Sequence, residues 1–226
     1  MTKLLAIDTS GDACSAALLL GGRIEQRLET APRRHGELIL GMMQQVLDDA
    51  GMRLAELDAI AFARGPGSFT GVRIAVAVAQ GAAFGAGIPL VPVSTLAAIA
   101  QGQFRRSGER RLLVALDARM GEVYWGCFEI DGRGLAMSCC DEQVCPPDRV
   151  DTPGTEGWRG VGPGWAAYGA ELAARTGLDP DVHAGEAICE ARDLAVLGAA
   201  EFAAGGSVPP QLAAPVYLRD RVTRVG

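Results

Sequence analysis

The sequence contains, between two apolar runs, the stretch Arg64-Gly65-Pro66-Gly67-Ser68-Phe69-Thr70-Gly71-Val72-Arg73. The apolar run 59–63 before it predicts a buried strand, and the Ala/Gly-rich run 74–86 after it predicts a helix. Glycine adopts backbone conformations that are closed to other residues, so the glycines favour a tight turn. Ser68 or Thr70 can cap the helix that follows. We therefore predict a strand, a glycine turn and a helix.

A turn of this kind often holds a phosphate, because free amides and the positive end of the helix point at one spot. A P-loop, however, requires Gly-x-x-x-x-Gly-Lys-Ser/Thr. The spacing from Gly65 to Gly71 is different, and no lysine follows it. A structural turn and a phosphate-binding turn both stay open, and the residues favour the structural one.

The composition excludes several classes of protein. The length of 226 residues suits one large domain or two small ones, and 49% apolar residues suffice for a core. The net charge of −6 provides no general basic field for nucleic acid. The first residues are too weakly apolar for a signal peptide, and the run 74–86 is shorter than the about 20 residues of a membrane span. We expect a cytoplasmic protein without a membrane partner.

Few residues offer ligands for a metal ion. The six cysteines contain no Cys-x-x-Cys pair, and the two histidines, His35 and His183, are far apart in the sequence. Zinc sites usually require such closely spaced ligands. We therefore expect no metal and no cofactor.

The two halves of the chain begin alike. Leu4 to Asp8 predicts a strand that ends in an acid, followed by a turn and a second strand, 13–20. After a charged segment, 105–111, the same pattern recurs from Leu112 to Asp117 and 122–130. This repetition predicts a duplicated α/β fold with mixed sheets. We expect lobes at 1–104 and 105–211, with 212–226 returning to the first lobe.

Several segments along nearly the whole chain resemble the bacterial TsaB family, also called YeaZ. They are Ala6-Ile7-Asp8-Thr9, the helix beginning at His35, the stretch 64–73, Val93-Ser94-Thr95-Leu96, the segment 117–124 and Pro215-Val216-Tyr217-Leu218-Arg219. The resemblance implies an actin-like (ASKHA, ribonuclease H-like) fold of two lobes with helices on both sheets. It also implies a role in making threonylcarbamoyladenosine, the modified base beside the anticodon of tRNAs that read ANN codons.

The resemblance implies partners as well. A related transferase, TsaD, would be the catalytic subunit, a TsaE-type ATPase would join the pair, and tRNA would bind through the complex. Alone, the chain would form a homodimer. The catalytic relative carries a His-x-x-x-His metal site whose ligands fall here on Thr95 and Ile99. Because isoleucine has no donor atom, the resemblance implies a dimerization subunit without catalytic residues.

In actin-like ATPases, acids at the positions of Asp8 and Asp117 help hold magnesium and phosphate. Alternatively, each acid caps its own turn. We expect a cleft between the two lobes and regard it as a vestigial nucleotide site, formed by Asp8, Thr9, Asp117, Gly162 and Gly164. An autonomous actin-like ATPase or small-molecule kinase remains the alternative function. A protease does not, since no Ser-His-Asp set has suitable spacing.

Helix 72–85 is apolar almost all round, and helix 37–50 has a wide apolar stripe. A helix that is apolar on every side must be covered on every side. We expect these helices to form the partner interface, through His35, Leu38, Met42, Met43, Val46, Val72, Val76, Ala79 and Ala83. Alternatively, the helices bury one another within the lobe, and His35 only caps or packs. The sequence does not reveal which side of the second helix faces outward.

Overall fold

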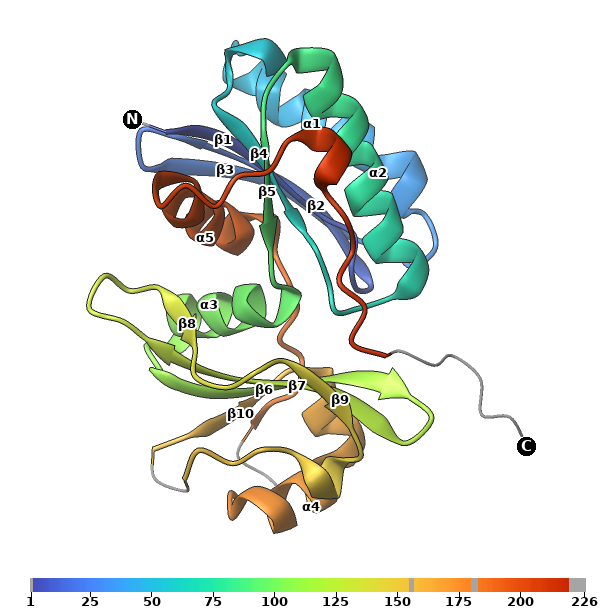
Figure 1. Ribbon diagram of the computed structural model, residues 1–226, viewed down its shortest axis with the longest axis vertical. Helices are drawn as coiled ribbons and strands as arrows, with labels where there is room; N and C mark the ends of the chain where they lie inside the picture. Colours follow the sequence, from blue (N-terminus) through green and yellow to red (C-terminus); the bar gives the residue numbers. More distant parts are fainter. Residues whose placement is uncertain (1, 155–156, 180–182, 220–226) are drawn as a thin grey trace.

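The computed structural model describes residues 2–154, 157–179 and 183–219, which form two mixed sheets with helices around and between them (Figure 1). The first sheet has the order β3-β2-β1-β4-β5. Its strands are β1 (Lys3–Asp8), β2 (Ala13–Leu20), β3 (Arg23–Thr30), β4 (Ala59–Ala63) and β5 (Leu90–Val93). Strands β1 to β3 are antiparallel to their neighbours in chain order, while β4 and β5 continue parallel to β1.

The second sheet repeats this topology with the order β11-β10-β6-β7-β8, and β9 also pairs with β7. Its strands are β6 (Arg111–Arg119), β7 (Glu122–Ile130), β8 (Ala136–Ser138), β9 (Gln143–Cys145), β10 (Arg159–Val161) and β11 (His183–Ala184). Here β6 to β8 are antiparallel, and β10 and β11 run parallel to β6. The predicted duplicated fold with mixed sheets is confirmed.

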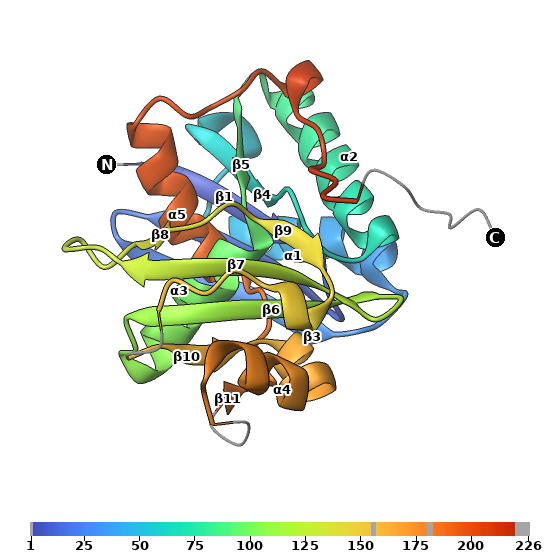
Figure 2. The same cartoon turned by 60° about the horizontal axis from the view of Figure 1, so that its bottom comes forward.

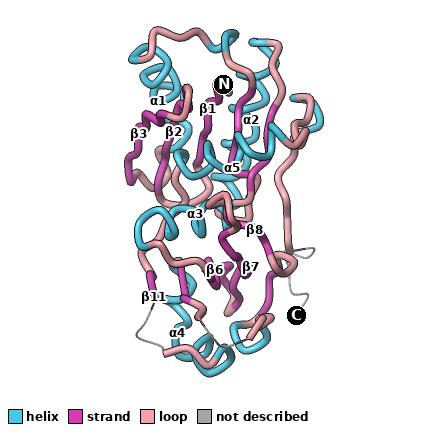
Figure 3. Tube along the Cα trace, turned by 90° about the vertical axis from the view of Figure 1, so that its left-hand side faces the viewer, coloured by secondary structure: helices cyan, strands magenta, loops and turns pink. Residues whose placement is uncertain are grey.

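The helices are α1 (His35–Asp49), α2 (Phe69–Ala86), α3 (Thr95–Ser107), α4 (Pro163–Thr176) and α5 (Ala191–Ala203), with short 3-10 turns at Leu54–Glu56, Pro147–Arg149 and Pro210–Leu212. Helices α1 and α2 cover the outer face of the first sheet, and α4 covers the outer face of the second (Figures 1 and 2). Helices α3 and α5 lie between the sheets and contact each other (Figure 3).

The two inner helices are exchanged between the halves of the chain. Helix α3 follows β5 of the first sheet but packs on β6, β7 and β8 of the second. Helix α5 follows β11 of the second sheet but packs on β1, β2 and β4 of the first. Gly198 permits this approach, because a Cβ there would lie 2.7 Å from that of Ala61. The chain therefore returns to the first sheet at α5, earlier than the expected boundary at residue 212.

The apolar core has three parts. One lies between α1, α2 and the first sheet, and another lies between α4 and the second sheet. The third lies between the sheets and contains side chains from both of them and from α3 and α5, including Leu4, Val114, Ile99 and Leu194. Because this inner core is continuous, the two lobes share one hydrophobic interior.

Helix α2 is long and apolar enough to cross a membrane by length and composition alone. The helix is longer than the sequence predicted, because it begins at Phe69 rather than Val72. Core helices of soluble proteins have the same properties, and one side of α2 packs on β4. The apolar surface of α2 is nevertheless only partly covered by its own lobe.

Candidate functional site

The glycine turn packs directly on the turn between β1 and β2. The Ser68 N–H donates to the carbonyl of Ser10 at 2.8 Å, and the Thr9 hydroxyl donates to the carbonyl of Gly71 at 2.7 Å. A Cβ on Gly67 would lie 2.5 Å from the Ser10 carbonyl oxygen, and one on Gly71 would lie 1.9 Å from that of Thr9. These glycines are required because two backbones meet here without space for a side chain.

The helix cap belongs to Ser68. Its hydroxyl accepts the N–H of Gly71 at 3.4 Å, as expected for one of the two candidate caps. The turn also binds α3 and the C-terminal segment, because the carbonyl of Gly65 accepts from Thr95 and that of Arg64 accepts from Val216. The structural interpretation of the turn thus has a specific basis: it joins three distant segments of the first lobe.

Asp8 ends β1 inside the protein, with only 1% of its surface exposed. One carboxylate oxygen accepts the Ser10 N–H at 2.9 Å, and the other has no hydrogen-bond partner. Burial raises the pKa of Asp8 to about 6, against the opposing effect of hydrogen bonds from Ser10. The buried His35 Nε2 also lacks a partner. The Asp8 carboxylate is therefore enclosed by the protein and is not accessible to a metal ion or a phosphate from solvent.

The other residues of the predicted cleft lie in the second lobe. Asp117 forms an ion pair with Arg119 at 2.9 Å and accepts a hydrogen bond from Tyr168 at 3.4 Å. Gly162 and Gly164 pack on Ala115, where a Cβ on either would lie under 3 Å from its atoms. Within the described residues, no hydrogen bond joins Asp8 to Asp117. Each acid serves the turn of its own lobe.

We expect the isolated chain to bind Mg-ATP weakly or not at all. A phosphate beside Asp8 needs several free amides, and the backbone of Ser68 and Gly71 already occupies this position by bonding to Ser10 and Thr9. Calorimetric titration of the purified chain with Mg-ATP is the measurement. A micromolar dissociation constant would contradict this expectation and favour the ATPase or kinase alternative.

Thr95 and Ile99 lie on the first turns of α3 and are both buried. Ile99 belongs to the apolar core between the sheets. Its side chain has no atom that could bind a metal at the position where a catalytic relative has a ligand. No group of three or more His, Cys, Asp or Glu side chains suited to a metal ion is found in the described part of the chain.

The structure corrects the choice of interface residues. Eight of the nine predicted side chains are buried within their own lobe: His35, Met42, Met43, Val46, Val72, Val76, Ala79 and Ala83. Leu38 is half-buried. Six of the eight belong to the core between α1, α2 and the first sheet, which is the alternative that the sequence left open. The interface itself stays a prediction, and most of these nine side chains are turned toward the core of their own lobe.

The exposed side of α2 is also apolar. Consecutive turns carry Ile74, Ala77, Val78, Gly81 and Phe84, and Phe84 is 79% exposed. On α1, Leu40 is 59% exposed. A groove of about 460 Å³ separates the two helices and is lined by Leu40, Met43, Gln44, Leu47, Asp48 and Ala82, with Met52 to Leu54 beyond α1. Ala77, Gly81 and Phe84 are exposed, while Ile74 and Val78 are half-buried. We call these five α2 residues, Leu40 and the groove the α1–α2 face.

The C-terminal segment 208–217 runs along α2 and borders this face (Figures 1 and 2). Gln80 donates to the carbonyls of Pro210 and Ala213. Arg73 donates to the Tyr217 hydroxyl at 2.7 Å and lies 3.5 Å from the centre of the Phe69 ring. These contacts join the described part of the segment to α2 of the first lobe, while 220–226, the rest of the segment expected to return there, lie outside the described residues.

Glu142 connects the lobes, although sequence reasoning did not identify it. Its carboxylate forms an ion pair with Arg64 at 3.1 Å and accepts the Ser94 hydroxyl. Arg64 is the first residue of the glycine turn, and Ser94 caps α3. One acid of the second lobe therefore binds both the turn and the start of α3. The sequence offered no local signal for this role, because Glu142 directly follows Asp141 and is one of several acids between residues 131 and 158.

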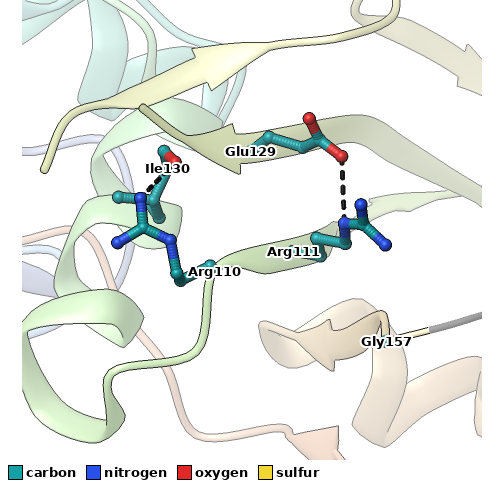
Figure 4. A pocket seen from close by; sticks show the side chains of 5 residues that line it. All are labelled: Arg110, Arg111, Glu129, Ile130 and Gly157. Carbon is teal, nitrogen blue, oxygen red and sulfur yellow. Dashed lines mark hydrogen bonds and ion pairs between the residues drawn. The ribbon is translucent and has the colours of Figure 1, made fainter. Parts of the chain in front are cut away.

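A shallow hollow of about 380 Å³ lies where β6 begins and β7 ends, two neighbouring strands inside the second sheet (Figure 4). Arg111 pairs with Glu129 at 3.1 Å, and Arg110 donates to the Ile130 carbonyl at 2.8 Å. Both arginines thus bind neighbouring groups of the protein itself.

Comparisons with known proteins find relatives of this chain in both sequence and fold. The profile of the family described as "TsaD: tRNA N6-adenosine threonylcarbamoyltransferase" matches residues 28–160. The chain is 42% identical to the tRNA threonylcarbamoyladenosine biosynthesis protein TsaB of Escherichia coli, covering 97% of this chain and 96% of that protein. The chain belongs to the TsaB family. TsaB of Haemophilus influenzae is 37% identical and 94% covered.

A solved structure of YeaZ from Pseudomonas aeruginosa matches with a TM-score of 0.90 and 44% identity, covering 96% of this chain and all of that one. The fold of the TsaB family therefore extends over both lobes. Another structure from that organism is described as similar to "peptidase YEAZ".

Proposed function

We propose that this chain is the non-catalytic dimerization subunit of a complex that forms threonylcarbamoyladenosine on tRNA. It binds and supports a TsaD-type transferase, which modifies the adenosine beside the anticodon of ANN-decoding tRNAs. A TsaE-type ATPase joins the pair, and tRNA binds through the complex. Without its partner the chain pairs with itself. We propose a cytoplasmic location for this assembly.

The observation that carries this proposal is the α1–α2 face. Apolar side chains on a soluble surface are usually scattered, whereas here Ile74, Ala77, Val78 and Phe84 follow one side of a single helix beside an apolar groove. Small residues such as Gly81 allow another helix to approach closely. A helical partner that places larger side chains over this stripe would cover α2 on its remaining side.

A non-catalytic role is supported by the residues at the expected metal-ligand position and at the turn beside Asp8. The position of a metal ligand is held by Ile99 in the inner core, and the turn beside Asp8 is closed by α2. The relatives from E. coli and H. influenzae are described as biosynthesis proteins for threonylcarbamoyladenosine. A subunit that acts through its surface rather than through an active site is consistent with both observations.

We expect the chain alone to leave tRNA unmodified, and to restore modification when combined with a TsaD-type subunit, a TsaE-type ATPase, ATP and the enzyme that forms threonylcarbamoyl-adenylate. The measurement is the amount of modified nucleoside recovered from tRNA by mass spectrometry. Modification by the chain without the TsaD-type subunit would refute a non-catalytic role. Full activity of the remaining components without the chain would refute a supporting role.

A further inference from the structure

Four of the six cysteines lie on neighbouring segments of the second sheet. Cys127 is on β7, Cys145 is on β9, and Cys139 and Cys140 follow β8 directly. All are free thiols. The Cys139 N–H donates to the Cys127 carbonyl at 2.9 Å, which continues the pairing of β8 with β7 by one residue. This contact places Cys140 beside Cys127.

The Cys140 sulfur lies against the backbone of Cys127. The backbone N–H of Cys127 donates to the Cys140 Sγ at 3.1 Å, where a sheet would normally offer a carbonyl. The Cys127 thiol itself donates to the carbonyl of Asp151 at 3.8 Å. Cys127 is fully buried beneath the sheet, whereas Cys140 is partly exposed. The Cys140 thiol is thus accessible to solvent, and the neighbouring Cys127 thiol is not.

The surroundings distinguish Cys140 from its neighbours. Hydrogen bonds from Cys127 lower the pKa of the Cys140 thiol, because they stabilise the negative sulfur. Burial raises the pKa of Cys139 and that of Cys145 to about 11 in each case. The thiolate is the reactive form of cysteine, so Cys140 is the best nucleophile among these thiols. A buried structural cysteine would need none of these donors.

We propose that Cys140 and Cys127 form a reversible disulfide when a peroxide oxidises the protein. The Cys140 thiolate attacks one oxygen of hydrogen peroxide, the O–O bond breaks, and hydroxide leaves, giving a sulfenic acid on Cys140. The Cys127 sulfur then attacks the sulfenic sulfur, the S–O bond breaks, and water leaves with the proton of the Cys127 thiol. Both sulfur atoms are oxidised by a total of two electrons, and the peroxide is reduced.

The pair lies close to the contact between the lobes. Glu142, which holds Arg64 and Ser94, is only two residues after Cys140. A covalent bond at Cys140 fixes the start of the segment that positions this carboxylate. The oxidised protein should therefore differ from the reduced one in amide hydrogen exchange around residues 94–97, where the Ser94 hydroxyl accepts the Ala97 N–H and caps α3.

The test treats the reduced full chain with hydrogen peroxide and maps its peptides by mass spectrometry. We expect loss of two hydrogen atoms, one cross-link between Cys127 and Cys140, and its reversal by dithiothreitol. Cys140→Ser should abolish the cross-link. Cys127→Ser should instead accumulate a sulfenic acid on Cys140 that dimedone traps. Cys139→Ser is the matched control, since it removes the adjacent exposed thiol and should leave the cross-link intact.

Three results would overturn the proposal. They are absence of the cross-link in the wild-type chain under these conditions, labelling of Cys139 by dimedone in preference to Cys140, and a cross-link that still forms at Cys127 in the Cys140→Ser variant. Thermal melting of each reduced variant verifies that it is folded, and the Cys127→Ser labelling provides a readout that does not require a disulfide to form.

Discussion

Replacing Ala77 with glutamate should reduce association with a TsaD-type subunit, and self-association, by at least about 100-fold. Ala77 is exposed in the middle of the α1–α2 face, between Ile74 and Phe84. An unpaired charge buried in an apolar interface costs several kcal/mol, and each ~1.4 kcal/mol changes the affinity tenfold. The melting temperature of the isolated chain should stay the same, because Ala77 faces solvent there. Sedimentation velocity with and without the partner measures the effect.

Two control variants separate the interface from the core. Ala79→Glu places the charge two residues away on the same helix, but Ala79 is fully buried, so this variant should lose its cooperative melting transition. Ala170→Glu places the charge at an exposed alanine of α4 in the other lobe and should alter neither melting nor association. Normal association of a folded Ala77→Glu variant would show that the partner binds elsewhere.

Replacing Asp8 with asparagine should increase the free energy of unfolding at pH 7 by up to about 3 kcal/mol. The pKa of Asp8 is about 6 in the folded protein and has an ordinary value of 3.8. Between these values the folded state holds a proton that the unfolded state has lost, so stability falls as the pH rises toward 6. Above pH 6 the folded protein keeps a buried charge, which asparagine does not have.

The pH dependence distinguishes this effect from general repacking. The gain should be near its maximum above pH 6 and should shrink to almost nothing below about pH 4, where the carboxyl is protonated in both states. Urea unfolding across this range measures it. Asp117→Asn is the control, since Asp117 ends the corresponding strand but is partly exposed and paired with Arg119. A gain that is equal at pH 4 and pH 7 would disprove the buried-charge explanation.

Much of the fold could be predicted from the sequence because its patterns are local. The apolar run before Asp8, the run 59–63 and the repeat near Asp117 each predicted a strand that the structure contains. Strands β8 and β9 could not be predicted, since they have three residues each and form only by pairing with β7. Within such short strands, contacts with the neighbour outweigh intrinsic preference.

The candidate site was less predictable, because it depends on which side of a helix faces inward. Helix α2 is apolar all round, so its sequence gives no direction, and Val76 and Ala77 are equivalent by residue type. In the structure Val76 is buried and Ala77 is exposed. The role of Glu142 was equally hidden, since an ion pair between lobes depends on their arrangement in space and leaves no local pattern.

The exchange of α3 and α5 has a consequence for the order in which the protein is synthesised. The ribosome completes the first sheet long before it reaches α5, which covers the inner face of that sheet. Until then the nascent chain exposes apolar residues such as Leu4 and Ala61 to its surroundings. Neither half of the gene encodes a unit with both sheet faces covered. The native lobes therefore require translation of nearly the whole chain, and fragments divided after residue 104 would each lack an inner helix.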